Sequence, residues 1–315
     1  MRLLETSDGY TFSPKEFLDE DNIPAYAILS HTWGKQEVTF QGLIRDSKKN
    51  SSRVRNSIRR LRPRPSKVGY DKIRFCARQT HRDGLRYFWV DTCCINKQDY
   101  TELGKAINSM FRWYQNAAKC YVYLSDVSSA GQKDRNEHPA WLADFYISRW
   151  FTRGWTLQEL LAPSAVEFFS KEGVCLGDRH GLKQHIHSIT KIPLRALSRA
   201  SLHEFSVEER LSWVKGRETS CKEDKAYSML GIFGVYLPLI YGEGYKNALG
   251  RLEEEIARSQ GGVIDQDTKA KRVPLSTVPF QRDNDFITRD GLNKISRICA
   301  KPGARAALVG LGGVG

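Results

Sequence analysis

A tryptophan and a glutamate four residues apart have the types and spacing that chemistry on a sugar ring would need. They are Trp155 and Glu159, in the segment SRWFTRGWTLQELLAP at 148–163. Residues i and i+4 of a helix share one face, so the ring and the carboxyl group would be neighbours. Aromatic residues around a carboxylate lower the local dielectric, and a carboxylate in such surroundings stabilises positive charge developing on a ribose. The structural alternative is that Glu159 pairs with Arg149 or Arg153 and that the tryptophans belong to the core.

Polar side chains lie at the ends of two apolar segments, 25–33 and 86–95, that are predicted to be buried strands. These side chains are Ser30, His31, Trp33 and Asp91. Ligands of parallel sheets collect at the carboxyl ends of the strands, so we expect the four residues to line one pocket with Glu159 and to bind substrate. Two alternatives stay open: His31 is a hydrogen-bonded structural residue, and Asp91 caps the turn that follows it.

Strand-like and helix-like segments alternate through the first half of the chain. Apolar residues have helical spacing in 69–85 and 102–117, and short apolar runs typical of strands occupy 25–33, 86–95, 119–127 and 165–170. This order predicts an α/β fold, with a parallel sheet and flanking helices. The region 200–260 is predicted to be a helical C-terminal extension. In it Ser220 and Glu223 fit a capping box, which leaves Asp224 without a role.

The net charge of +13 is concentrated in one segment, because residues 45–67 alone carry +9. That segment is polar, contains Ser and Pro and lacks interleaved aromatic residues, so we interpret it as a solvated loop and consider nucleic-acid binding the weaker alternative. No signal peptide is visible, and the most apolar run, 229–241, is too short to span a bilayer. We therefore expect a cytoplasmic protein that does not bind membranes.

The seven cysteines form no CxxC pair, which favours a reducing compartment over a disulfide framework or a zinc ribbon. Cys93 and Cys94 are expected to be small buried residues, with a nucleophilic cysteine as the alternative. A group of Cys and His residues has no standard zinc spacing and is interpreted as a surface loop without a metal: Cys175, His180, His185 and His187.

The C-terminal RAALVGLGGVG is an apolar strand running into glycines, and these fit two phosphate-binding templates. Gly310, Gly312, Gly313 and Gly315 match G-x-G-x-x-G, and they also match a P-loop that stops before its Lys and Ser/Thr. Both motifs need a following helix whose N-terminus faces the phosphate, and the sequence stops before one. We therefore expect no tightly bound nucleotide or other cofactor in the chain as given.

Five segments, among them AYAILSHTWG, FWVDTCCINK and EDKAYSMLGIFGVYLPLIYGEG, together resemble the fungal heterokaryon-incompatibility (HET) domain over about residues 25–260. One departure is Asn96, where the family more often has Asp. Residues 263–303 look like a linker leading into a STAND NTPase of the NB-ARC or NACHT kind, and 304–315 look like its first strand and P-loop. The resemblance implies a HET domain at 1–262, and a cell-death effector of a fungal NOD-like receptor that self-associates.

In that case the partners are further copies of the chain and the NTPase and repeat domains of the same protein, and ATP or GTP binds only in the complete NTPase domain. A more distant similarity is to TIR domains, which have a flavodoxin-like fold. In TIR enzymes the glutamate four positions after a tryptophan carries NAD⁺ glycohydrolase activity, and Trp155 and Glu159 have that spacing. This similarity implies that Glu159 is catalytic, that Trp155 stacks on a ring and that NAD⁺ is the substrate. The alternative is a scaffold without catalysis.

Overall fold

The computed structural model describes residues 1–19, 22–46, 68–130 and 139–260. They belong to the first of the two compact units into which the chain divides, Met1–Gly262. The predictions for 263–303, for 304–315 with its four glycines, and for most of the basic segment 45–67 concern residues outside this description.

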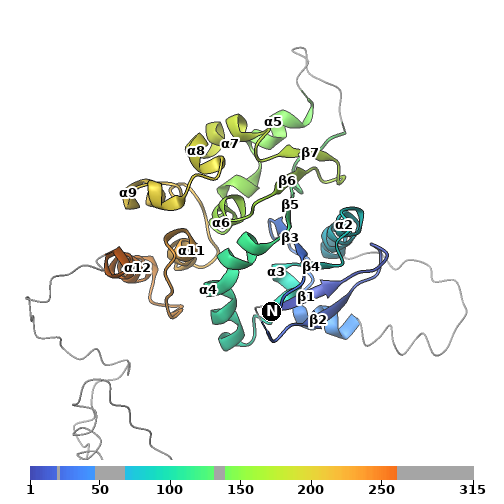
Figure 1. Ribbon diagram of the computed structural model, residues 1–315, viewed down its shortest axis with the longest axis horizontal. Coiled ribbons are helices and arrows are strands. Elements are labelled where there is room, and N and C mark those ends of the chain that lie inside the picture. Colours follow the sequence, from blue (N-terminus) through green and yellow to red (C-terminus); the bar gives the residue numbers. More distant parts are fainter. Residues whose placement is uncertain (20–21, 47–67, 131–138, 261–315) are drawn as a thin grey trace, which may run out of the picture. The chain divides into compact units, whose positions relative to one another are not determined.

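A seven-stranded mixed sheet forms the centre of the described residues (Figure 1). Its strand order is β2-β1-β4-β3-β5-β6-β7. The strands are β1 (Arg2–Glu5), β2 (Ser13–Glu16), β3 (Tyr26–His31), β4 (Tyr87–Trp89), β5 (Lys119–Tyr123), β6 (Val166–Phe169) and β7 (Cys175–Asp178). The predicted α/β class is confirmed, but the sheet is not wholly parallel. Strands β4, β3, β5 and β6 are parallel, and β1, β2 and β7 add antiparallel pairs at the two edges.

All six residues of β3 are buried, which explains why this strand reads as a continuous apolar run. Parallel strands are covered by helices on both faces and therefore rarely show alternating polarity. On one side of the sheet lies α2 (Val68–Arg82), and on the other lie α4 (Tyr100–Asn116) and α6 (Thr156–Leu161) (Figure 1). Shortly after α2 comes Gly84, whose φ of 72° lies in the left-handed region that glycine adopts readily.

The predicted strand 86–95 is wrong in its second half. Strand β4 ends at Trp89, and the short helix α3 (Asp91–Cys94) follows directly. Thr92, Cys93 and Cys94 are all buried in α3. A buried helix and a buried strand give the same short apolar run, so periodicity could not separate them here. The consequence for the site is that Asp91 begins a helix at the carboxyl end of β4.

Segment 148–163 contains two short helices rather than one helix start. The 3₁₀ helix η1 (Arg149–Thr152) is separated from α6 by a turn, and all six residues of α6 are buried. Helix α5 (Trp141–Tyr146) precedes them. Because α6 contacts both β3 and α4, it brings Glu159 to the inside of the fold.

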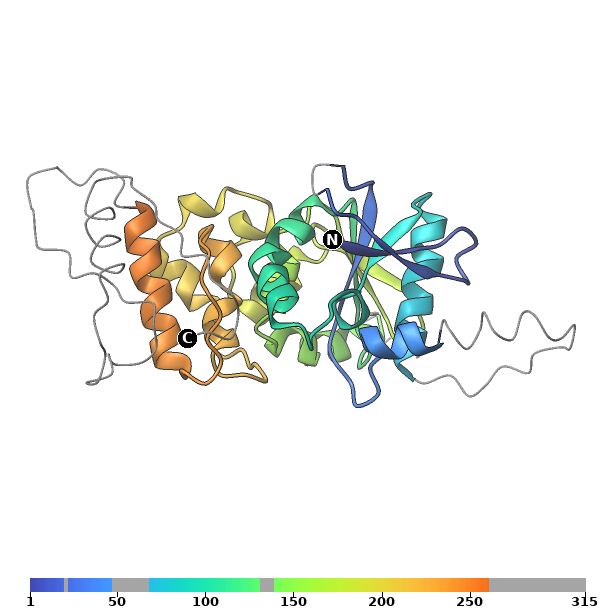
Figure 2. The ribbon, with the colours of Figure 1, turned by 90° about the horizontal axis from the view of Figure 1, so that it is seen from below.

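The C-terminal part of the described chain is helical, and its helix α11 packs on α4 (Figure 2). A Cβ added at Gly231 would lie 2.0 Å from the Phe111 Cβ, so this packing requires glycine. The helices are α7 (Lys183–Thr190), α8 (Leu194–Leu197), η2 (Leu202–Glu204), α9 (Val207–Ser212), α10 (Asp224–Tyr227), α11 (Leu230–Phe233) and α12 (Tyr245–Gln260).

The predicted capping box of Ser220 and Glu223 is not formed. The Glu223 carboxylate instead accepts hydrogen bonds from the backbone N–H groups of Gly242 and Gly244, at 3.0 and 2.9 Å. Both glycines have positive φ, a backbone conformation that most side chains disfavour. Glu223 therefore fastens the YGEG turn to the start of α10, which is a tertiary contact that no local motif encodes.

Candidate functional site at the carboxyl ends of the parallel strands

The candidate site lies at the point in the sheet where the strand order reverses, so that consecutive parallel strands lie on opposite sides of β3. In chain order the parallel strands are β3, β4, β5 and β6, and their order across the sheet is second, first, third, fourth. The connections leaving β3 and β4 therefore go to opposite sides of β3. In doubly wound sheets, ligands bind outside the carboxyl ends of the strands at such a switch point.

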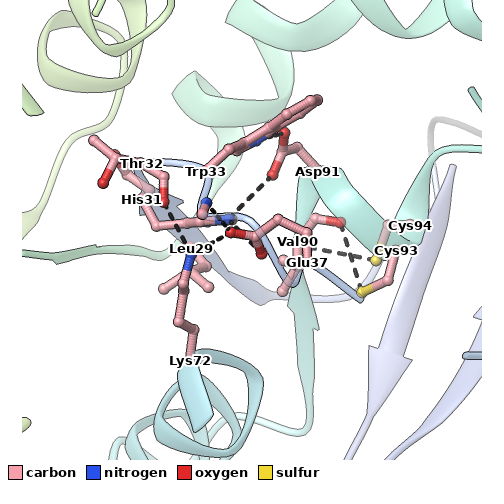
Figure 3. A network of polar contacts seen from close by, with 12 residues as sticks. Leu29, His31, Thr32, Trp33, Glu37, Lys72, Val90, Asp91, Cys93 and Cys94 are labelled. Atoms are coloured by element: carbon pink, nitrogen blue, oxygen red, sulfur yellow. Dashed lines mark hydrogen bonds and ion pairs between the residues drawn. The ribbon is translucent and has the colours of Figure 1, made fainter. Parts of the chain in front are cut away.

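His31, the last residue of β3, is buried beside two carboxylates (Figure 3). Its Nε2 atom lies 3.7 Å from Oε2 of Glu37 and 3.9 Å from Oδ1 of Asp91. Neither ring nitrogen has a hydrogen-bond partner among the residues that the structure describes. Buried polar groups are usually paired, so an unpaired imidazole between two carboxylates is typical of a functional site.

Glu37 is held as an anion by the groups around it. Its Oε1 atom accepts hydrogen bonds from the Lys72 ammonium and from the Gly34 N–H. Burial by itself raises the pKa of Glu37, but the contacts with His31, Lys72 and Gly34 outweigh burial and hold the pKa at about 2. Lys72 is itself buried, and it also donates to the Thr32 carbonyl at 2.9 Å.

Asp91 connects the site to an exposed aromatic ring. Its Oδ2 atom accepts a hydrogen bond of 2.8 Å from the Trp33 indole N–H and lies 3.4 Å from the Lys97 ammonium. The same ammonium lies 3.4 Å from the centre of the Trp33 ring. Trp33 is 51% exposed, so Asp91 and Lys97 together hold a large aromatic face at the surface.

Glu159 is buried on the inner side of the site. Its Oε2 atom accepts a hydrogen bond from the Ser30 hydroxyl, and Ser30 in turn accepts one of 2.8 Å from the Trp150 indole N–H. Burial raises the pKa of Glu159 to about 8, and the charge of Asp91 adds to that rise. Arg149 pairs with Asp126 and Arg153 donates to Ser220, so the ion pair considered for Glu159 is not formed.

The structure therefore brings Ser30, His31, Trp33, Asp91 and Glu159 together at one edge of the sheet. Trp155 does not join them, because its indole N–H donates to the Asp224 carboxylate at 3.2 Å. Asp224, to which the sequence assigned no role, also accepts a hydrogen bond from Tyr241. It therefore links Trp155, at the start of α6, to the helical C-terminal part.

Sequence reasoning missed Glu37 and Lys72, which lie in a polar loop and on the polar face of a predicted helix. A cavity of about 380 Å³ adjoins the site, and Glu37 and Lys97 line it together with Phe40, Arg45, Asp46 and Tyr70 among others. Its volume is in the range of small-molecule sites. A second cavity, of about 410 Å³, lies between α4, the segment after α8 and α11. Neither of these two cavities is the pocket predicted from the sequence, because neither is lined by any of its five residues, Ser30, His31, Trp33, Asp91 and Glu159.

The predicted surface loop with Cys175, His185 and His187 is instead strand β7 and helix α7. Tyr146 pairs with His185, and His187 with the Ile192 carbonyl. Within the described ranges, no group of three or more His, Cys, Asp or Glu residues could hold a metal ion. Contact with Cys94 and burial raise the pKa of the Cys93 thiol well above its usual range, which disfavours the nucleophilic thiolate.

Within the same ranges, no helix is long and apolar enough to span a membrane.

The fold and the site define an α/β protein with a doubly wound parallel core and a polar site at its switch point. Residues 26–144 match the family model described as heterokaryon incompatibility protein (HET). Over 267 residues, 84% of the chain, the sequence is 52% identical to vegetative incompatibility protein HET-E-1 of Podospora anserina. The chain is a HET domain protein. It covers 18% of the length of that relative. No solved structure matches the chain.

Proposed function

We propose that this chain is an effector domain acting in vegetative incompatibility, and that it hydrolyses the N-glycosidic bond of NAD⁺ at the site around His31 and Asp91. The first half of the proposal rests on the 52% identity to a vegetative incompatibility protein. The second half rests on the convergence of five of the six predicted substrate and catalytic residues at the switch point of the sheet.

The chemistry of the site suits this reaction. Loss of nicotinamide leaves positive charge on the ribose, and the Glu37 and Asp91 carboxylates lie where they can stabilise such charge. The exposed Trp33 ring can stack on a nicotinamide or adenine ring. The adjoining cavity of about 380 Å³ has cationic and anionic lining residues, which suits a dinucleotide with a diphosphate and a cationic ring.

Two further observations support a TIR-like mode of action. The parallel strands have the order second, first, third, fourth, which is also the order in flavodoxin-like sheets. Glu159 has the sequence position of the TIR glutamate, and the fold puts its carboxyl group next to Ser30. In this proposal Glu159 orients the ribose side of the site through Ser30.

The wider setting of the domain also belongs to the proposal. The sequence of 263–315 supports a following STAND NTPase that binds ATP or GTP, as in NOD-like receptors. Oligomerisation of that NTPase would bring several HET domains together in the cytoplasm and trigger cell death. Self-association of the chain is the corresponding activation step.

The test is nicotinamide release from NAD⁺ by the purified chain over a wide range of protein concentration. We expect release that rises more steeply than protein concentration and falls at least about tenfold in Glu159→Gln. Glu253→Gln, at an exposed position of α12, is the matched control and should release nicotinamide like the wild type. Absence of release at every concentration, with oligomers confirmed by sedimentation, would falsify the enzymatic half of the proposal.

One observation favours a second candidate, a self-associating scaffold without catalysis. Apolar side chains are exposed along the segment after α11, where Tyr236 is 66% and Ile240 is 49% exposed. Such side chains suit contact with another copy of the chain. The scaffold predicts that Tyr236→Ser with Ile240→Ser abolishes both oligomers and cell death, whereas Glu159→Gln leaves both intact.

A further inference from the structure

We propose that His31 is the general base of the site, and that its Nε2 atom takes a proton from the water that attacks the ribose. This inference rests on the proposed NAD⁺ hydrolysis and adds a catalytic role for a residue predicted only to bind substrate.

The imidazole of His31 is buried and, within the described ranges, unpaired. His31 is 6% exposed, and both of its ring nitrogens lack a hydrogen-bond partner among the described residues. A structural histidine in such a position would normally donate from one nitrogen and accept at the other. The part of the chain that the structure describes leaves both buried ring nitrogens unpaired, so in this proposal a water molecule enters the site beside the ring and takes the free position at Nε2.

The two carboxylates beside His31 are each anchored through one oxygen. Oε1 of Glu37 is engaged by Lys72 and by the Gly34 N–H, and its other oxygen, Oε2, faces His31. In the same manner, Oδ2 of Asp91 is engaged by the Trp33 indole and by Lys97, and its Oδ1 faces His31. Each carboxylate thus has one oxygen fixed by neighbouring donors and presents the other to the ring.

This arrangement places two carboxylate oxygens against the nitrogen that would receive the proton. The distances of 3.7 and 3.9 Å are too long for hydrogen bonds, but at such distances in a buried site the attraction between opposite charges is strong. Lys72 from α2 and Lys97 after α3 are the cations that contact these carboxylates. Glu159 from α6 is linked to the site through Ser30, and Tyr114 from α4 and Arg217 lie close to Glu159. The two carboxylates are fixed before the reaction, so they need not reorganise when the proton arrives.

The step balances without an added acid or oxidant. The water oxygen forms a bond to C1′ of the ribose, and one water proton goes to Nε2 of His31. The bond from C1′ to the pyridinium nitrogen breaks, and its electron pair goes to that nitrogen, which gives neutral nicotinamide. The imidazolium then releases its proton to solvent. The leaving group needs no protonation, so a single base suffices.

The test measures nicotinamide release against pH for the wild type, His31→Asn and His31→Ala. We expect a rate that falls on the acid side in the wild type, a loss of at least about 100-fold in both variants, and partial recovery of His31→Ala by added imidazole. Asp91→Asn, if it retains measurable release, should move the acid limb to lower pH, because an imidazolium with one carboxylate fewer loses its proton more readily. His180→Asn, at an exposed position before α7, is the matched control.

The outcomes separate this inference from the function on which it rests. A wild type without nicotinamide release contradicts the proposed function. A wild type with release whose His31→Asn variant keeps its rate and its acid limb overturns only the inference. If the His31 variants are folded by circular dichroism and inactive, but imidazole restores nothing and Asp91→Asn does not move the acid limb, His31 has a structural role and the inference is wrong.

Discussion

Glu37 and Glu159 are two carboxyl groups at the same edge of the sheet, and their surroundings favour opposite charge states. Glu37 is surrounded by an ammonium group, a backbone N–H and an imidazole, which hold its pKa at about 2. Glu159 is buried, and although Ser30, Tyr114 and Arg217 favour its anion, burial outweighs them and its pKa rises to about 8. At pH 7 the first is therefore an anion and the second is mostly neutral.

The comparison shows that the charge of this site lies on residues other than the one that the sequence singles out. Stabilising positive charge on a ribose needs an anion, and at neutral pH the anions next to His31 are Glu37 and Asp91. Glu159 accepts the hydrogen bond from Ser30 and stays mostly protonated until the pH approaches 8. Four experiments test this contrast.

Lys72→Met should have the largest effect, because it leaves the Glu37 carboxylate buried without its cation. We expect the free energy of unfolding at pH 7 to fall by about 3 kcal/mol, measured by urea denaturation. Lys72→Met combined with Glu37→Gln should regain part of this loss, since the uncompensated charge is then gone. A loss below about 1 kcal/mol in Lys72→Met would show that Glu37 does not depend on Lys72 for its charge.

Wild-type stability should fall as the pH rises from about 5 to about 8. In this window the folded state keeps the Glu159 proton and the unfolded state has lost it, so each rise in pH favours unfolding. The expected difference between wild type and Glu159→Gln across the window is on the order of 3 kcal/mol, from urea denaturation at each pH. Glu37→Gln should act with the opposite sign and only between about 2 and 4.5, where the wild type gains stability as Glu37 ionises. Parallel wild-type and Glu159→Gln profiles would contradict the raised pKa.

Ser30→Ala should cost about 2 kcal/mol, because it leaves the Glu159 carboxyl group and the Trp150 N–H without their shared partner. The Ser30 hydrogen bond lowers the pKa of Glu159, so Ser30→Ala should raise that pKa. The pH range over which stability falls should then reach to higher pH. Ser188→Ala is a suitable control, because that exposed hydroxyl only donates to a carbonyl of its own helix. Equal effects of the two substitutions would mean that Ser30 does not support Glu159.

Lys97→Ala should have the smallest effect, about 0.5–1 kcal/mol, since this ammonium is partly exposed. The loss should shrink at high salt, because screening weakens exposed charge pairs. Trp33 fluorescence should change as well, since the cation no longer lies over the ring. An unchanged spectrum would indicate that Lys97 does not hold Trp33 in solution.

Much of the frame that positions the site could be predicted from the sequence. The continuous apolar run of β3 and the helical spacing in α2 and α4 predicted the parallel core, and the polar residues at the ends of its strands predicted the edge where Ser30, His31, Trp33 and Asp91 meet. Strands β1, β2 and β7 were not predicted. Segments such as SPKE and CLGD are short, polar strands, formed by pairing with a neighbour rather than by their own pattern.

The α/β class, the edge of the sheet at which polar side chains collect, and the HET family follow from the amino-acid sequence alone. Which of those side chains are charged and which way they face depends on the packing of distant segments. Lys72 and Glu37 look solvated in the sequence, and only the packing of α2 against β3 buries them together. Trp155 keeps its spacing from Glu159, but its indole N–H binds Asp224, more than sixty residues away in the chain. Local spacing fixes which residues are neighbours along an element, whereas burial and charge depend on groups that other segments bring to them.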